Sequence, residues 1–473
     1  MKKVVYFVMA GGEGMRLWPM SRSHFPKQLH SLLGDSSLLQ QSIERLRAIG
    51  APQDILIGTR TDLYFSIKEQ WENMGIGCPP WLILEPLSRN TAPAIALAVC
   101  ACRQRYGEDV IIVTLAADHV IKQPARFRQL VAKGVNIAAK GTIVTFGIIP
   151  AYPETGYGYI KVGEKIEEDV FRVGQFKEKP GAETAVKYVQ SRDYLWNSGM
   201  FIFDTKVMAD NLKRFCPKVW DTAVKVWKKR KEKPDNVSFD QKPFSMFPNV
   251  SIDYAVMEKV SNGAVIKADF GWCDVGCWRM VYEVSPKDKD GNVFSGDVYS
   301  LDTRNTFVKS DRRFVAAVGL KDLIVIDTPD ALLISDRGRS QDVKNVVNRL
   351  NARQSHLTKF HTTVYRPWGN YTVLEEGPGY KIKRVVVKAK GQLSLQKHNF
   401  RSEHWVVVSG KAQVVSGKKK CLLKQNESVF IPKGHKHRIS NPFNKEVVII
   451  EVQTGAKITE EDIVRFDDLY ERC

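Results

Sequence analysis

The sequence has no long hydrophobic run and no regular cysteine pattern. No apolar stretch in its 473 residues approaches the roughly 20 residues that a membrane-spanning helix needs, so we expect no membrane segment. The first apolar run, residues 4–10, is short and leads directly into Gly11, which fits a buried strand better than a secretory signal. The eight cysteines are irregularly spaced in a chain long enough to build a core without them. We therefore expect reduced thiols and a cytoplasmic location.

Acidic residues are outnumbered by basic ones, 52 against 71, which leaves a formal charge of +19. Such an excess fits a nucleic-acid surface, a membrane surface or a protein that handles phosphorylated substrates. The lysine-rich runs at 228–233 and 418–420 fall in expected helix ends or hairpin loops, with no recognisable nucleic-acid fold around them. We interpret them as solvated faces and expect neither nucleic acid nor a membrane as a partner.

The length excludes a single core and predicts several domains. In residues 1–285, short apolar runs such as 111–113 alternate with longer helical patterns, which predicts a Rossmann-like α/β domain with a mostly parallel sheet. Residues 286–355 predict a small β-rich connector and a linking helix. Residues 356–473 alternate strand patterns with Gly- and Asn-containing turns, which predicts a small antiparallel β-barrel.

A glycine-rich loop with two cations follows the first expected strand. Gly11, Gly12 and Gly14 let the backbone approach an anion closely, and Arg16 and Lys27 add positive charge where a triphosphate would lie. Tight turns use glycines as well. The combination of glycines and cations therefore carries the prediction of a phosphate site.

Asp118 follows the apolar run 110–114 and would lie at the carboxyl end of a strand, where open α/β sheets bind ligands. A carboxylate there suits Mg²⁺. Aspartate also caps helices that follow strands, and the residues alone leave that alternative open.

Together with later segments, this loop resembles the signature of nucleotide-sugar pyrophosphorylases, and the resemblance covers the first 280 residues. The segment with Glu85, Arg89 and Asn90 resembles the branch that makes GDP-mannose, which implies that Arg89 and Asn90 contact guanine. The resemblance also implies that Asp274, in the segment 271–278, joins Asp118 on Mg²⁺.

The same resemblance implies a sugar-phosphate pocket. Gly156 belongs to its first segment, Glu178 and Lys179 to its second, and Asn197 to its third. Lys179 would hold the phosphate, with Glu178 and Asn197 on sugar hydroxyls. The implied reaction joins mannose 1-phosphate to GTP and releases pyrophosphate. Positioning and charge stabilisation carry such a reaction without a side-chain nucleophile, and Arg16 and Lys27 are the expected catalytic cations.

The segments 365–369, 393–405 and 432–438 of the C-terminal region resemble the isomerase half of bifunctional type II phosphomannose isomerase/mannose-1-phosphate guanylyltransferases, a cupin-like domain. Gln396 and His398 are two residues apart and share one face of a strand. Glu403 and His437 would complete a four-ligand site for Zn²⁺ or another divalent ion. A single histidine is more often a surface or core residue than a ligand, so the prediction depends on the whole set.

The implied second reaction interconverts fructose 6-phosphate and mannose 6-phosphate, with Arg401 recognising the substrate and the general base unassigned. Asn399 and Phe400 stand where relatives usually have histidine. On a continuous strand Phe400 would share the face of His398 and line the pocket. Two alternatives stay open: a guanylyltransferase with a silent cupin domain, and a non-enzymatic scaffold, which would not need so complete a set of charged pocket residues. The sequence also leaves the oligomeric state open, a homo-oligomer included.

Overall fold

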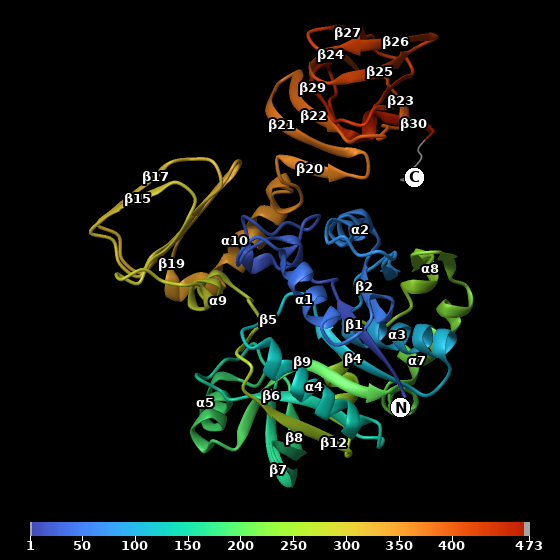
Figure 1. The fold of residues 1–473 in the computed structure, drawn as a ribbon. Helices are drawn as coiled ribbons and strands as arrows, with labels where there is room; N and C mark the ends of the chain where they lie inside the picture. The colour runs from blue at the N-terminus through green and yellow to red at the C-terminus, as the bar shows by residue number, and fades with distance from the viewer. Residues whose placement is uncertain (1, 468–473) are drawn as a thin grey trace. The chain divides into compact units, whose positions relative to one another are not determined.

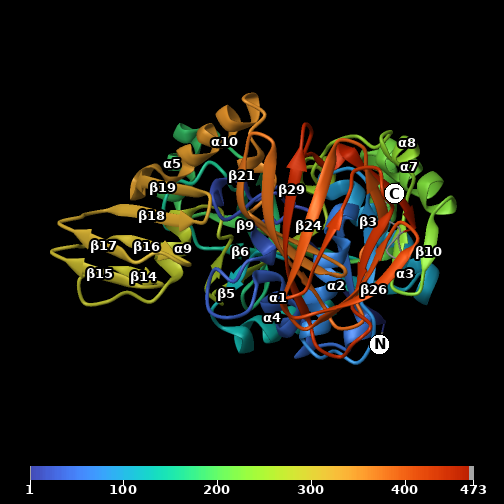
Figure 2. The ribbon, with the colours of Figure 1, turned by 90° about the horizontal axis from the view of Figure 1, so that it is seen from above.

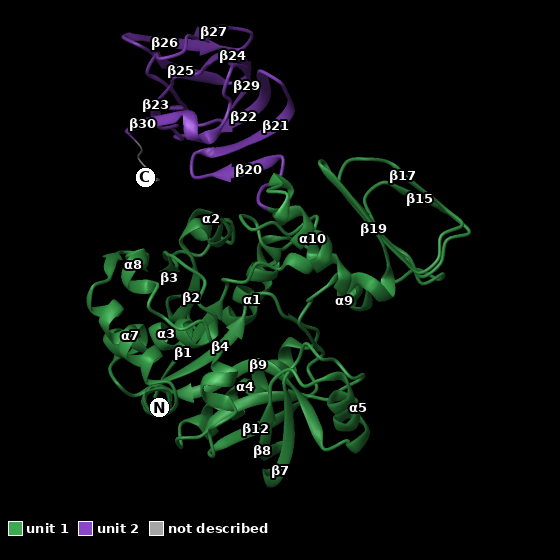
Figure 3. Ribbon diagram, turned by 180° about the vertical axis from the view of Figure 1, so that it is seen from behind, with its two compact units in different colours: residues 1–358 green, residues 359–473 purple. Residues whose placement is uncertain are grey.

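The structure, a computed structural model, describes residues 2–467. The chain divides in sequence between Thr358 and Lys359 into two compact units, which Figure 3 shows in two colours. The α/β domain, the β-rich connector and the C-terminal antiparallel β-domain are confirmed. The bounds 1–285, 286–355 and 356–473 remain a prediction.

The first unit is built on an eleven-stranded sheet with the order β10-β11-β3-β2-β1-β4-β9-β6-β12-β8-β7 (Figure 1). Its central strands β1 to β4 are mutually parallel where they pair, and β9 is antiparallel to both of its long neighbours. The strands are β1 (Lys3–Met9), β2 (Ile55–Arg60), β3 (Trp81–Glu85), β4 (Val110–Ala116), β6 (Ile143–Ile148), β7 (Tyr159–Glu167), β8 (Val170–Lys177), β9 (Tyr194–Asp204), β10 (Lys231–Lys233), β11 (Asn236–Ser238) and β12 (Gly263–Ala268).

Helices cover both faces of this sheet, which is why β1 is apolar almost throughout. Val5 and Phe7 pack into the core that contains helices α3 (Thr91–Tyr106), α6 (Thr205–Phe215) and α7 (Pro217–Lys228). Tyr6 and Val8 point to the opposite side, toward α1 (Leu38–Arg47), α2 (Tyr64–Asn73) and α4 (Pro124–Ala138). The carboxyl ends of the parallel strands therefore open at a single edge between two helical layers.

The connector forms short strands that run side by side (Figure 2). They are β14 (Val293–Ser295), β15 (Val298–Leu301), β16 (Phe307–Ser310), β17 (Val315–Val318), β18 (Leu323–Thr328) and β19 (Ala331–Asp336). Helix α10 (Val343–Ala352) follows, within the expected linking segment. Leu17 and Trp18 share one buried core with Phe307, Ile324 and Val347, so the connector packs against the signature loop of the first domain.

The second unit contains two antiparallel sheets, with orders β20-β21-β22-β29-β24-β27 and β26-β25-β28-β23-β30. The strands are β20 (Thr363–Arg366), β21 (Gly369–Gly377), β22 (Tyr380–Val387), β23 (Leu395–His398), β24 (Arg401–Ser409), β25 (Lys411–Ser416), β26 (Lys419–Lys424), β27 (Ser428–Ile431), β28 (His437–Ser440), β29 (Val447–Gly455) and β30 (Ile463–Asp467). Alternate residues of β22, β24 and β29 fill the core between the sheets.

None of the helices among residues 2–467 is long and apolar enough to cross a membrane. The seven cysteines of this part are unpaired. Cys473 lies outside the described residues.

Candidate functional sites

The first site is a cavity of about 1060 Å³ at the carboxyl ends of β1, β3 and β4. Most residues predicted from the sequence line it: Gly11, Gly12, Gly14, Arg16, Lys27, Arg89, Asn90, Asp118, Gly156 and Lys179. The other predicted residues of this domain, Asp274, Glu178 and Asn197, are not in its lining, but Asp274 and Glu178 each contact a residue that is. The fold thus brings together segments more than 150 residues apart.

Lys27 joins the two aspartates predicted to bind Mg²⁺. Its ammonium group lies 2.9 Å from Asp118 Oδ2 and donates a hydrogen bond of 3.0 Å to the main-chain oxygen of Asp274. Gly14 has a φ of +64°, and a Cβ there would lie 2.7 Å from Lys27 Cγ, so only glycine leaves room for the Lys27 side chain. Burial raises the pKa of Asp118, but the charges of Lys27 and then His119 outweigh it and lower that pKa overall.

The carboxylate of Asp274 is held in place by two donors. Tyr157 donates its hydroxyl to Asp274 Oδ1 at 2.7 Å, and the amide of Gly276 donates to the same oxygen at 3.1 Å. A Cβ on Gly276 would lie 2.6 Å from Asp274 Oδ2 and 3.2 Å from Arg16 Nη2. A side chain at position 276 would therefore crowd both Asp274 and Arg16.

The donor set fits Mg²⁺. Two carboxylates, one at the end of β4 and one beyond β12, are the hard oxygen ligands that this ion takes when it also keeps water and substrate phosphate oxygens. Asp118 lies in a turn that leads into the short strand β5 (Val120–Ile121) and begins no helix, so the capping alternative is excluded.

The segment expected to meet guanine lies at the start of α3. Asn90 adopts a φ of 71°, and its side-chain oxygen accepts a hydrogen bond from the amide of Thr91, so it caps the helix. Arg89 donates to the main-chain oxygen of Ser245 at 3.1 Å. Glu85 lies deeper in the same wall, and burial raises its pKa to about 8. The cavity thus presents a guanidinium, an amide nitrogen and a carboxyl group along one wall.

The predicted sugar pocket adjoins this cavity. Glu178 is buried and pairs with Lys179 at 3.1 Å. Gly158 makes room for it, since a Cβ there would lie 2.4 Å from Glu178 Oε2. Asn197 donates to Asp253 Oδ1 at 2.9 Å. Burial, and then the charge of Glu178, raise the pKa of Asp253 to about 7.

Several residues of this site were not predictable from the sequence. Tyr157 directly follows Gly156, but no pattern in the sequence marks it or Asp253 as a site residue. Gln341 and Lys344 come from the connector and line the same cavity, and Gln341 accepts a hydrogen bond of 2.8 Å from Arg16. The connector therefore holds a cation of the signature loop, which only the long-range packing shows.

The second site lies in the C-terminal unit, where His398, Glu403 and His437 place one ligand atom each within 4.8 Å of one another. His437 donates Nδ1–H to the main-chain oxygen of His435 at 2.9 Å, which assigns its lone pair to Nε2. That nitrogen lies 3.1 Å from His398 Nε2, which in turn lies 3.1 Å from Glu403 Oε1.

This donor set fits a divalent cation, because two imidazole nitrogens and a carboxylate converge in a buried position. Gln396, the fourth predicted ligand, lies directly opposite His437 in the ladder between β23 and β28. Burial alone would raise the pKa of Glu403. The hydrogen bond and the charge of His398 outweigh this effect, together with the charges of His437 and Arg401, and lower the pKa of Glu403 to about 2.

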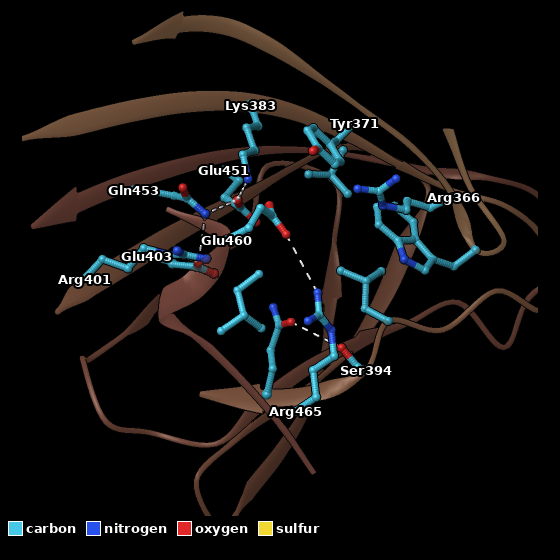
Figure 4. Close-up of a pocket in the computed structure, with 15 residues that line it drawn as sticks. Arg366, Tyr371, Lys383, Ser394, Arg401, Glu403, Glu451, Gln453, Glu460 and Arg465 are labelled. Atoms are coloured by element: carbon cyan, nitrogen blue, oxygen red, sulfur yellow. Dashed lines mark hydrogen bonds and ion pairs between the residues drawn. The ribbon is translucent and has the colours of Figure 1, made fainter. Parts of the chain in front are cut away.

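Arg401 lies against this trio. Its Nε is 3.2 Å from Glu403 Oε1, and its Nη2 is 3.4 Å from His398 Nε2. These are the atoms that would bind a metal, so the guanidinium would compete with a bound metal for them. Arg401 also lines the cavity next to the trio, with Arg366, Lys383, Glu451 and Arg465 (Figure 4).

The expectation that Phe400 lines the pocket is wrong. Strand β23 ends at His398 and β24 begins at Arg401, so Asn399 and Phe400 form a turn between them. Asp462 accepts hydrogen bonds from both of their amides, and Phe400 is 54% exposed. The departure from histidine at these positions therefore leaves the metal trio intact.

Three family models match the chain in sequence. "Nucleotidyl transferase" matches residues 5–291, "MannoseP isomerase/GMP-like beta-helix domain" matches 296–350, and "Mannose-6-phosphate isomerase C-terminal" matches 353–468. Together they span both sites and the connector.

Relatives match the chain along its full length. A mannose-1-phosphate guanylyltransferase of Escherichia coli K12 is 43% identical over 99% of both chains. The xanthan biosynthesis protein XanB of Xanthomonas campestris is 42% identical over 100% of both, and the alginate biosynthesis protein AlgA of Pseudomonas aeruginosa is 41% identical over 98% of this chain and 96% of its own.

Two solved structures resemble it as well. One, named as a mannose-1-phosphate geranyltransferase of Thermus thermophilus, is 33% identical with a TM-score of 0.66 over 74% of this chain and 99% of its own. The other, a mannose-6-phosphate isomerase of Helicobacter pylori, is 26% identical with a TM-score of 0.51 over 58% of this chain and 100% of its own.

Proposed function

The chain belongs to the family of mannose-1-phosphate guanylyltransferases that carry a C-terminal mannose-6-phosphate isomerase domain, and from this we propose that it makes GDP-mannose and pyrophosphate from GTP and mannose 1-phosphate. The observation that carries the proposal is the single cavity in which Gly14, Arg16, Lys27, Asp118 and Lys179 meet. Such a product suits the polysaccharide pathways that the names of two relatives mention.

Each group has a task in this reaction. The sugar phosphate, held by Lys179, attacks the α-phosphorus of GTP in line, and Arg16 and Lys27 stabilise the charge of the departing pyrophosphate. Asp118 and Asp274 would hold Mg²⁺, which supplies further charge stabilisation on the phosphates when bound. Glu178 and Asn197 bind sugar hydroxyls, while Arg89 and Asn90 face the base.

We propose a second activity at the C-terminal site, the interconversion of fructose 6-phosphate and mannose 6-phosphate. It is supported by the buried His398, Glu403 and His437, which with Gln396 would hold Zn²⁺ or another divalent ion. A bound metal would polarise the sugar carbonyl. Arg401 lies between the trio and the cavity and is placed to contact the substrate.

The two proposed activities and the connector would occupy three modules with the bounds 1–285, 286–355 and 356–473. The cysteines of residues 2–467 are unpaired, which supports the proposal of a cytoplasmic enzyme. Homo-oligomer formation is compatible with this proposal.

The purified chain tests both activities directly. We expect pyrophosphate release with GTP and mannose 1-phosphate, at least about tenfold faster than with UTP or glucose 1-phosphate, since the buried polar groups beside the base and sugar penalise a mismatched partner. Fructose 6-phosphate should yield mannose 6-phosphate. Absence of pyrophosphate release with every pair would refute the first proposal, and absence of isomerisation would leave the silent-domain alternative.

A fragment ending at Thr358 should keep guanylyltransfer within about threefold of the full chain and lose isomerisation, because the first cavity lies wholly in that unit. The last residues of this fragment should contribute to its stability. Trp18 donates to the main-chain oxygen of Leu357 at 2.9 Å, and Ser23 donates to that of Thr358 at 3.0 Å. A matched fragment ending at Ala352 lacks both acceptors and should unfold at lower temperature. Equal melting temperatures would contradict the role of this segment.

A further inference from the structure

A buried carboxyl group that neither site uses lies in the wall of the C-terminal cavity. Glu451, on β29, is 6% exposed and lines the cavity together with Glu403, Arg401 and Gln396. Figure 4 shows Glu451 beside Gln453 and Lys383, facing the cavity. A buried carboxyl group is costly unless it is paired, so its presence calls for an explanation.

The register of β29 explains how it comes to lie there. Val447, Ile449, Glu451 and Gln453 point to one face, since side chains alternate along a strand. The first two are in the apolar core, and the last two reach the cavity. The inner face of β29 therefore changes from apolar to polar where the barrel interior becomes a cavity.

Two neighbours hold the Glu451 side chain. Gln453 donates one amide nitrogen to Glu451 Oε1 at 2.7 Å and to Glu403 Oε1 at 2.9 Å. Lys383 is its direct partner across the β22–β29 ladder, with Nζ 3.8 Å from Oε1. Among the described residues no hydrogen bond engages Glu451 Oε2. One carboxylate oxygen is anchored and the other is available to a bound molecule.

The other carboxylates of the cavity are less suited to accept a proton from a substrate. Both carboxylate oxygens of Glu403 already have partners, which are His398, Arg401, Trp405 and Gln453. Glu460 has a side chain 57% exposed and lies 3.7 Å from Arg465. A general base needs a shielded carboxylate with a free oxygen, and Glu451 alone combines the two.

We propose that Glu451 is the catalytic residue that carries the proton between C1 and C2 of the hexose 6-phosphate, with Lys383 as its partner. The proposal rests on the isomerase activity proposed above. Arg366 and Arg465 line the same cavity and supply positive charge for the phosphate end of the substrate, which turns the carbonyl end toward Glu451.

The step balances without any further reactant. Glu451 takes the proton from C1 of fructose 6-phosphate, the C–H electron pair forms the C1=C2 bond, and the Lys383 ammonium gives its proton to the C2 oxygen. The resulting enediol takes the proton back from Glu451 at C2. The C1 hydroxyl returns its proton to Lys383 as the new carbonyl forms, which gives mannose 6-phosphate and restores both side chains.

The environment of Glu451 supports this role. Burial, followed by the charge of Glu403, raises its pKa to about 7, and Glu460 adds to the rise while Lys383 and Arg401 oppose it. A base with a pKa near the working pH exchanges protons efficiently in both directions.

The test compares Glu451→Gln, Glu451→Asp and the control Glu446→Gln in the full chain loaded with a divalent ion. Glu446 is exposed just before β29 and lies outside the cavity. We expect Glu451→Gln to lower isomerase kcat at least about 100-fold, with KM within about threefold, since only proton transfer is lost. Glu451→Asp keeps the acid at a shorter reach and should recover part of that rate. The second readout, exchange of the C1 or C2 proton with D₂O followed by NMR, should fall in parallel with kcat.

Each outcome decides the matter. A Glu451→Gln chain that isomerises within about threefold of wild type overturns the assignment, as does Glu451→Asp when it folds normally and is no faster than Glu451→Gln. A loss of metal content or melting temperature equal to the loss of activity would assign Glu451 a structural role instead. A wild-type chain that does not isomerise at all refutes the proposed isomerase activity itself, a result that differs from any of these.

Discussion

An Asp274→Asn variant should lose at least about 100-fold in kcat/KM for GDP-mannose formation, because it removes one of the two negative charges expected to hold Mg²⁺. Asparagine has nearly the same shape, and its side-chain oxygen can still accept from Tyr157 and Gly276, which contact Asp274 Oδ1 at 2.7 and 3.1 Å. The loss should therefore concern the metal and spare the fold. Pyrophosphate release across a Mg²⁺ titration measures it, and the half-saturating concentration should rise as the maximal rate falls.

Asp269→Asn is the matched control. Asp269 lies five residues earlier with a side chain 65% exposed, and it pairs with Arg126 at 2.7 Å on the surface. An exposed pair of this kind is worth about 0.2–1 kcal/mol, so activity and melting temperature should hardly change. An Asp274→Asn enzyme with the wild-type rate and Mg²⁺ dependence would refute the metal assignment. Isomerase activity should be the same in all three proteins, since it depends on the other unit.

A His437→Ala variant should lose both the bound divalent ion of the C-terminal site and isomerase activity, with kcat at least about 100-fold lower. His437 is 1% exposed, and its Nε2 faces His398 and Glu403. Without it, His398, Glu403 and the predicted ligand Gln396 remain, and the loss of one imidazole nitrogen should weaken binding of a first-row ion. The metal content of the protein and its isomerase rate should fall together. In the wild type, chelation should remove the activity and a divalent ion should restore it.

His435→Ala provides the control for that variant. His435 is exposed and contributes its main-chain oxygen to His437, and alanine keeps that oxygen. We expect normal metal content and isomerisation in His435→Ala, and guanylyltransfer within about twofold of wild type in both variants. If His437→Ala isomerises as fast as wild type, the site of His398, Glu403 and His437 is not the isomerase site.

The first site shows how far local sequence signals reach. Gly14, Lys27 and Asp118 were predictable because glycine, cation and carboxylate each have a backbone or charge requirement that is visible in a short segment. Their meeting in one cavity follows from parallel strands, whose carboxyl ends share one edge of the sheet. Tyr157 and Gln341 were not predictable, since a tyrosine or glutamine has no such requirement and acquires a role only from its partner.

Phe400 and Glu451 show the same limit in the C-terminal unit. Two-residue alternation correctly placed Gln396 and His398 on one strand, but it could not show that the strand ends at His398, where Asp462 binds the next two amides. Nor could it show that Lys383 of β22 lies opposite Glu451 of β29.

The sequence by itself determined the order of α/β, β-rich and antiparallel parts, and it predicted a phosphate loop and the types of metal ligand, because these depend on composition and spacing within a few turns or strands. The tertiary structure alone decided which distant side chains meet. Strand register sets those meetings: a shift of one residue would turn Glu451 away from the cavity, and the energy that fixes the register comes from burying Val447 and Ile449 in a core shared by several strands.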